Sequence, residues 1–168
     1  MKQTLKILTL VLTLLALSCG GGEEKKEEKA KVQLKKQTTT KKVEPKATNT
    51  KPSETIDLTS KGIGPITSLT LPSEINQTMV AKGKDIFDKM CTACHRLGKK
   101  FIGPPPNGLF EKRTPEWVMN MILNPDEMVQ KDPLAKALLM EFNGSPMANQ
   151  NLTEDEARAI LEYFRTLK

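Results

Sequence analysis

Apolar residues recur at helical spacing in the C-terminal half of the chain. Ile86, Phe87 and Met90 follow this period and predict a helix over residues 80–94. Three more helices are indicated by start signals, of which two place proline at the first helical position and one is a capping box. They begin at Thr114-Pro115, Asp132-Pro133 and Thr153, and the first two end near Asn124 and before Asn143.

No stretch of this half is rich in strand-like alternation, and no internal repeat is found. The predicted fold class is therefore all-α, with a small domain of about four helices over residues 79–168. The hydrophobic core of such a domain is thin for its size, so a buried cofactor would add greatly to its stability.

A second apolar pattern lies at the N-terminus. Lys2 and Lys6 precede an apolar run over residues 7–17, which is too short to span a bilayer core of about 30 Å as a helix. A short buried helix is the alternative, but the next stretch of chain offers nothing for it to pack on. We therefore expect residues 1–18 to be a secretory signal peptide. The sequence Leu-Ala-Leu-Ser-Cys19-Gly resembles a bacterial lipoprotein signal, which implies lipidation of Cys19.

Residues 19–61 are mostly Lys, Glu, Thr, Gln, Pro and Ser. Such a segment buries too little apolar surface to offset its ordering entropy, so we predict a disordered linker. A flexible chain of about 40 residues has a reach of roughly 35 Å, which suits a swinging tether as well as a passive spacer. Residues 62–78 alternate apolar and polar positions and are interpreted as an extended arm laid over the domain.

The charge of the chain is unevenly distributed. The formal net charge is +6, but residues 78–168 contribute only +1 of it. The domain also contains few aromatic residues, whereas binding to single-stranded nucleic acid uses a basic groove with stacking aromatics. Nucleic acid is therefore not expected as a partner.

The sequence Cys91-Thr-Ala-Cys94-His95 has the C-x-x-C-H pattern of c-type haem attachment. Two thiols at this spacing can each reach one vinyl group of a porphyrin, and the adjacent imidazole can then bind the iron. A thioredoxin-like site would lie near a βαβ pattern, a structural zinc site needs four ligands, and a simple disulfide leaves His95 unexplained.

His95 is the only histidine of the chain, which excludes bis-histidine ligation and limits the domain to one conventional haem. The sixth iron ligand is then a methionine, a lysine, another weak donor or water. Ligation by histidine and methionine together would raise the reduction potential.

With these residues the domain resembles a class I cytochrome c over about residues 79–168. Gly83 and Phe87 match the N-terminal helix of that family, and Ile160 and Tyr163 match the C-terminal helix that crosses it. The resemblance implies a cytochrome c-like domain that holds one covalent haem c. It also implies that the carbonyl group of Pro104 accepts a hydrogen bond from His95, which would fix the tautomer of the ring.

The resemblance further implies that Met147, in the loop before the last helix, is the sixth ligand. Met140 and Met128 are the competing candidates. Arg113 and Trp117 are candidates for contacts with a haem propionate, although a core aromatic residue and a surface cation are equally good interpretations.

The function that follows is transfer of single electrons by a carrier that is not an enzyme. The expected location is outside the cytoplasm, with a lipid anchor in a bacterial membrane and the domain facing the periplasm or the cell surface. The expected partners are a redox donor and a redox acceptor, such as a quinol-oxidising complex and a terminal oxidase or nitrogen-oxide reductase. The alternatives are a haem enzyme or gas sensor with an open iron site, and a thiol redox lipoprotein that uses Cys91 and Cys94.

Overall fold

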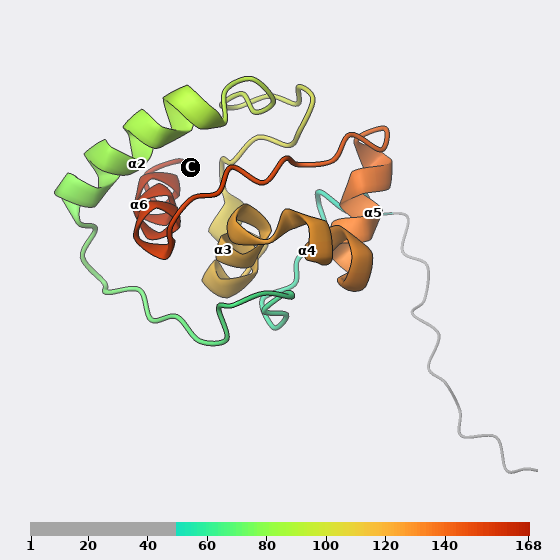
Figure 1. Cartoon of the computed structure of the whole chain (residues 1–168), viewed down its shortest axis with the longest axis horizontal. Helices are drawn as coiled ribbons and strands as arrows, with labels where there is room; N and C mark the ends of the chain where they lie inside the picture. The colour runs from blue at the N-terminus through green and yellow to red at the C-terminus, as the bar shows by residue number, and fades with distance from the viewer. Residues whose placement is uncertain (1–49) are drawn as a thin grey trace, which may run out of the picture. The chain divides into compact units, whose positions relative to one another are not determined.

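The computed structural model describes residues 50–168, so the predicted signal peptide, Cys19 and most of the predicted linker lie outside the described residues. Within this part the chain is helical, and its only β-structure is two isolated β-bridges. The all-α prediction is confirmed. The elements are α2 (Gln77–Met90), the 3-10 helix η1 (Leu109–Glu111), α3 (Pro115–Leu123), α4 (Pro125–Lys131), α5 (Pro133–Glu141) and α6 (Glu154–Phe164) (Figure 1).

Three helices begin where the sequence predicts. The side chain of Thr114 accepts a hydrogen bond from the N–H of Trp117 at the start of α3. Asp132 accepts one from the N–H of Ala135 at the start of α5. Thr153 forms a reciprocal capping box with α6, because both the side-chain and the backbone bonds are present. Each bond satisfies a backbone donor that the first helical turn leaves free.

Two helix predictions need correction. The first helix was predicted over residues 80–94, but α2 begins earlier, with Asn76 as its cap, and ends at Met90. The helix α4 was not predicted, because Asn124-Pro125 was interpreted only as a stop signal. Asn124 in fact ends α3 and precedes α4, whose first position Pro125 occupies. The backbone N–H at the first position of a helix has no partner within the helix, so proline, which lacks this N–H, is favourable there. The dipeptide Asn124-Pro125 can therefore end one helix and begin the next.

The helices α2 and α6 lie side by side (Figure 1). A Cβ atom built on Gly83 of α2 would lie 2.0 Å from the carbonyl oxygen of Ala159 in α6. Beside this close approach, the ring of Phe87 packs against Tyr163 and Phe164, at centroid distances of 5.6 and 5.7 Å. The glycine thus allows the backbones to meet, and the aromatic rings fill the space next to the contact.

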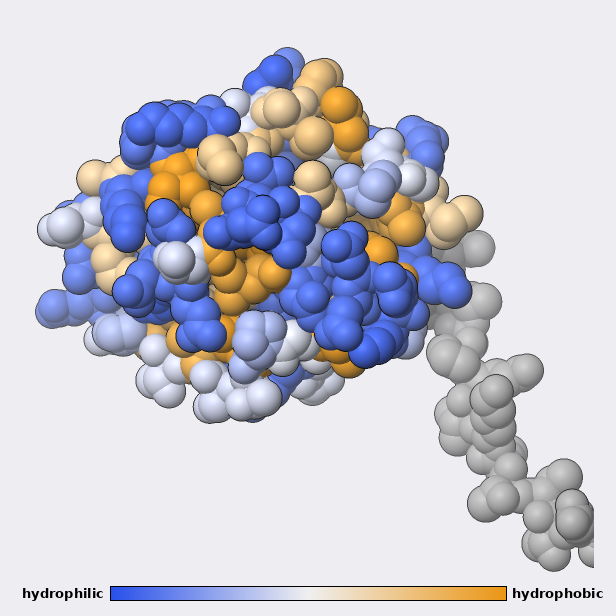
Figure 2. Space-filling view, viewed as in Figure 1, coloured by the Kyte–Doolittle hydropathy of each residue, from blue (hydrophilic) through white to orange (hydrophobic). Residues whose placement is uncertain are grey.

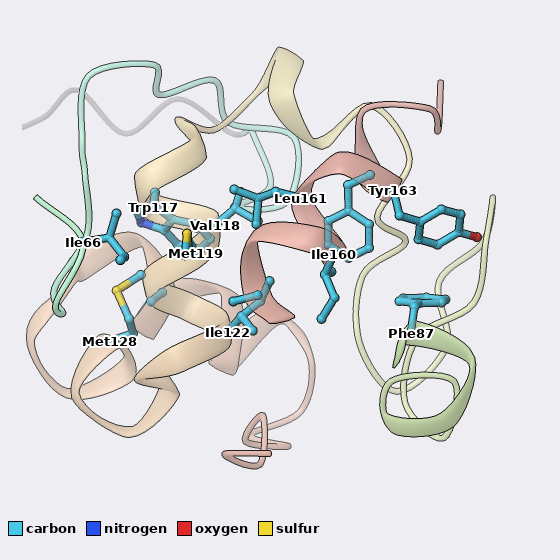
Figure 3. Packing of buried hydrophobic residues seen from close by; sticks show 13 residues of the cluster. Ile66, Phe87, Trp117, Val118, Met119, Ile122, Met128, Ile160, Leu161 and Tyr163 are labelled. Atoms are coloured by element: carbon cyan, nitrogen blue, oxygen red, sulfur yellow. The ribbon is translucent and has the colours of Figure 1, made fainter. Parts of the chain in front are cut away.

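The helix α3 supplies most of the remaining core. Trp117, Val118, Met119 and Ile122 are all buried, and Figure 3 shows them between α6 and the N-terminal part of the described chain. Every face of α3 is therefore covered, which explains why its sequence is apolar nearly all round.

Residues 50–76, called the leading segment below, lie against this helical body. Asn120, which is 1% exposed, donates hydrogen bonds to the carbonyl oxygens of Lys61 and Ile66 and accepts one from the N–H of Ile66. Farther along, Arg165 donates to the carbonyl oxygens of Pro72 and Ser73. The segment is thus held by hydrogen bonds to its backbone and by the packing of Ile63, Ile66 and Leu69 with the core.

The boundary predicted at residue 61 is therefore too late. Residues 50–61 were assigned to the disordered linker because they are polar, but their backbone packs on the domain. The N–H of Asp57 donates to the carbonyl oxygen of Lys112, and Ser53 donates twice to the carboxylate of Glu141. The partners that order this stretch lie elsewhere in the sequence, so its own composition does not reveal them.

None of the helices within residues 50–168 has the length and apolar character needed to cross a membrane. On the face that Figure 2 shows, strips of hydrophobic surface lie between hydrophilic side chains. The exposed large apolar side chains include Met90, Leu97, Phe101 and Ile102, which surround the Cys91–His95 motif in the sequence.

Candidate functional site

The motif residues lie where α2 ends. Cys91 caps the C-terminus of the helix, and its carbonyl oxygen accepts hydrogen bonds from the N–H groups of Cys94 and His95, at 3.1 and 2.9 Å. Cys91 is half-buried and Cys94 is exposed, and no disulfide joins them. The turn places all three side chains on the wall of one cavity of about 700 Å³. That volume lies within the usual range of cofactor pockets.

The pKa of the Cys91 thiol is raised to about 11, mainly by burial and additionally by the nearby Cys94. Cysteines that act as thiol nucleophiles have lowered pKa values, which keep the thiolate available at neutral pH. Cys91 would be protonated there. Its environment therefore gives no support to a dithiol redox site.

His95 is oriented by the loop that follows it. Its Nδ1 atom lies 2.7 Å from the carbonyl oxygen of Pro104. Because a carbonyl oxygen only accepts, Nδ1 carries the proton and Nε2 keeps a free lone pair. A Cβ atom on Gly103 would lie 2.6 Å from Cε1 of the ring, so glycine is required for this approach. The result is an imidazole in the tautomer that binds a metal through Nε2.

The methionines divide clearly by position. Met147 is partly buried and lines the same cavity as His95. Met140 is 70% exposed, and the sulfur of the fully buried Met128 accepts a hydrogen bond from the N–H of Ile63. Neither of these two competitors lines the cavity.

Two further methionines, Met90 and Met121, also line the cavity, and the sequence analysis did not single them out as ligands. Met90 directly precedes Cys91 at the end of α2, and Met121 lies in α3. Met121 falls within the helix predicted from Thr114 to near Asn124, and that pattern gives no signal that it borders the cavity.

The two candidate propionate contacts differ in their environment. The indole Nε1 of Trp117 is buried and has no hydrogen-bond partner within the described residues, and Trp117 lines the cavity. Arg113 also lines the cavity, but its guanidinium donates to the carbonyl oxygens of Pro52, Thr55 and Lys112. A buried N–H without an acceptor is costly, so Trp117 has a donor available for a bound polar group.

Part of the cavity wall was missed by sequence reasoning. Lys51, Ser53 and Glu54 line the cavity, although they fall in the stretch predicted to be a linker. The rest of the wall is mainly apolar. Its side chains include those of Ile122, Val129, Leu138, Leu152, Ile160 and Phe164.

The residues present fit a covalently held haem. Two thiols and an imidazole with a free Nε2 lie at one wall, apolar side chains cover much of the rest, and a buried indole N–H lacks an acceptor. A family model described as "Cytochrome c" matches residues 80–168 of the chain. The chain belongs to the cytochrome c family. Its cofactor is a covalently bound haem c, and Cys91 and Cys94 supply the attachment pattern of the family.

Solved structures agree with this assignment. The cytochrome c from Rhodothermus marinus is 41% identical to the chain, with a TM-score of 0.59 over 61% of this chain and 88% of that one. An engineered cytochrome c from the same organism, bound to a carbene intermediate, is 40% identical, with a TM-score of 0.57 over 61% and 88% of the two chains. A search of curated protein sequences found no match. The prediction of a cytochrome c-like domain is therefore confirmed, and the haem-based role is that of an electron carrier.

Proposed function

We propose that this cytochrome c is a membrane-tethered carrier that passes single electrons between redox proteins outside the cytoplasm, with His95 and Met147 as the axial ligands of its haem iron. The observation that carries the proposal is that both side chains line one cavity while the Nδ1 atom of His95 is bound to Pro104. The haem supplies a single iron that alternates between the ferrous and ferric states.

The chain's own residues support a role in electron transfer through the orientation of His95. The carbonyl group of Pro104 accepts a hydrogen bond from Nδ1, which fixes the orientation of the ring. Gly103 lets the ring lie against the loop, as its contact distances indicate. An imidazole held in this way needs little rearrangement when the charge on the iron changes.

Met147 is the methionine best suited to the sixth position. It lies in the loop between α5 and α6, and its side chain packs partly against the core. One long hydrogen bond joins the loop to α3, from the side-chain amide of Asn149 to the carbonyl oxygen of Leu123 at 3.5 Å. A thioether ligand favours the ferrous state and raises the reduction potential, as a carrier to a downstream oxidant requires.

The proposed location rests on the sequence before the domain. An apolar run over residues 7–17, followed by Cys19, supports export and lipid anchoring to a bacterial membrane, with the domain facing the periplasm or the cell surface. The proposed partners are a quinol-oxidising complex as the donor and a terminal oxidase or nitrogen-oxide reductase as the acceptor.

The test uses the full-length chain produced with haem-maturation machinery. The native protein should be reducible and should give a c-type absorption spectrum. Its ferric form should show the weak far-red band that arises when a methionine sulfur binds the haem iron. Met147→Ala should abolish that band and lower the midpoint potential. Met121→Leu is the matched control, because Met121 lines the same cavity, and it should retain the band. Retention of the band by Met147→Ala would remove Met147 from the proposal.

A second candidate function is a haem with an open iron site for an external ligand. The exposure of Ser145, Pro146 and Ala148 beside Met147 favours it, since a loop with so little packing can release its methionine. One engineered relative is described as bound to a carbene intermediate. Carbon monoxide distinguishes the two candidates: the native ferrous carrier should not bind it rapidly, whereas an open-site protein should.

A further inference from the structure

Arg113 is buried, at 3% exposed, and lies between η1 and α3. One terminal nitrogen donates to the carbonyl oxygens of Thr55 and Lys112, and the other donates to that of Pro52 at 2.8 Å. The guanidinium also lies over the ring of Trp117, 5.4 Å from its centroid. Two of its three hydrogen bonds are therefore made to the leading segment, and its flat face lies over the indole.

The stretch that Arg113 holds forms part of the cavity wall. Residues 51–54, called the rim segment below, make a compact turn in which the N–H groups of Glu54 and Thr55 donate to the carbonyl oxygen of Lys51. Lys51, Ser53 and Glu54 of this turn line the cavity.

The rim segment has a second attachment on the other side. The N–H and hydroxyl groups of Ser53 donate to the carboxylate of Glu141 at the end of α5, at 2.8 and 2.6 Å. The ammonium group of Lys112 adds a longer bond to the carbonyl oxygen of Ser53, at 3.4 Å. The turn is thus fastened between the start of α3 and the end of α5.

We propose that Arg113 is a positioning residue that keeps the haem reduction potential high by clamping the rim segment over the cavity. The inference rests on the proposed electron-carrier function. The ferric haem carries one more positive charge than the ferrous haem, so exclusion of water from its surroundings disfavours the oxidised state. Access of water to a metal site is set by the residues that close it, and the rim segment is one of these.

The test compares the haem-loaded full-length protein with Arg113→Lys. The lysine keeps the positive charge but cannot span the carbonyl groups of Pro52 and Thr55 in a planar fork. We expect the amides of Ser53 and Asp57 to exchange hydrogen about tenfold faster, because their bonds depend on the clamped turn. We also expect the midpoint potential to shift to lower values.

Arg165→Lys is the matched control. Arg165 also donates to carbonyl groups of the leading segment, but its partners Pro72, Ser73 and Glu74 do not line the cavity. This control should leave the midpoint potential and the exchange of the Ser53 and Asp57 amides unchanged. Ser53→Ala is a milder second variant, which removes one bond to Glu141 and should lower the potential in the same direction.

Three results would overturn the proposal. A lower potential with unchanged exchange at Ser53 and Asp57 would mean that Arg113 acts on the haem directly. Faster exchange with an unchanged potential would mean that the rim segment does not control the haem environment. An equal fall in the Arg165→Lys control would make the effect a general loss of stability. The far-red band of the native protein is measured separately from the potential and the amide exchange. Absence of that band would count against Met147 ligation and not against the role of Arg113.

Discussion

The Nδ1 atom of His95 lies 2.7 Å from the carbonyl oxygen of Pro104, across a loop that includes Gly103. This contact gives the proposed iron ligand one defined tautomer and one ring orientation. The pattern C-x-x-C-H states only that an imidazole follows the thiols. The loop of residues 103–104 determines how that imidazole is held.

Gly103→Ala should disrupt this contact, because the added methyl group would lie 2.6 Å from Cε1 of the His95 ring. Partners that orient a metal ligand typically contribute about 10–100-fold to its affinity. Because one proton competes with iron for Nε2, we expect the acid midpoint for loss of the histidine ligand to rise by about one to two pH units. Acid titration of the absorption spectrum measures this midpoint.

Gly98→Ala is the control for that experiment. Gly98 lies in the same loop with φ of 67°, so alanine strains the backbone there, but nothing lies within 4 Å of the added Cβ atom. The acid midpoint of this variant should stay close to that of the native protein. Equal shifts in both variants would assign the effect to the loop as a whole.

Gly83→Ala tests the close approach of α2 and α6. Alanine would by itself favour the helix by about 0.8–1.0 kcal/mol. Its methyl group, however, would lie 2.0 Å from the carbonyl oxygen of Ala159, which is backbone and cannot rotate away. Overpacking of this kind typically costs about 1–3 kcal/mol or more, so we expect a net loss of stability.

Chemical denaturation of the haem-loaded protein measures the loss at Gly83. Lys82→Ala, at the exposed neighbouring position, is the control and should change the unfolding free energy by less than about 0.5 kcal/mol. A Gly83→Ala variant as stable as the native protein would show that the two helices can separate without cost.

Local patterns predicted much of this fold, because the information lies within a few residues of each feature. Thr114, Asp132 and Thr153 each cap a helix through a bond to the residue three positions later. The helix α4 was missed for a similarly local reason, since Asn124-Pro125 serves as an end and as a start. The same dipeptide carries both meanings, and only the packing of Pro125 and Met128 decides between them.

The cavity was less predictable than the motif that borders it. Cys91, Cys94 and His95 are close together in the sequence. Ser53, in contrast, is held at the cavity wall by hydrogen bonds to Glu141, which lies 88 positions away. Arginine is usually a surface residue, but Arg113 is buried and donates hydrogen bonds to carbonyl groups of the leading segment. Long-range bonds of this kind leave no periodic pattern in either segment, so the sequence could not place residues 51–54 on the wall.

Glu162 predicts a pH dependence of stability. Burial alone would raise the pKa of its carboxyl group, but hydrogen bonds from Arg158 and Arg165 and one from the N–H of Asn76 outweigh burial and hold the pKa below the ordinary value of a glutamate. The ionised group is therefore favoured by folding. Its stabilising contribution is complete above the unfolded-state pKa and is lost as the pH falls through the lower folded-state pKa.

Glu162→Gln should remove this dependence. At pH 7 the variant should be less stable than the native protein by about 1–3 kcal/mol, since two arginines lose an ionised acceptor. The difference should shrink as the pH falls through the lowered folded-state pKa, where the native carboxylate takes up a proton. Denaturation curves from pH 7 to pH 3 give the difference directly, and a gap that is constant with pH would contradict the assignment.

Cys19 provides the test of the tether. If it is lipidated, its acyl chains bind the membrane with roughly 0.8 kcal/mol per buried methylene, and several chains together give stable attachment. Cys19→Ser keeps a side chain of similar size but removes the thiol to which the lipid would be attached. We expect the variant to appear in the soluble exported fraction with its haem, or to remain unprocessed with residues 1–18 attached. Cell fractionation with intact-mass measurement distinguishes these forms. A Cys19→Ser protein that stays in the membrane with residues 1–18 cleaved would show that another part of the chain holds it there.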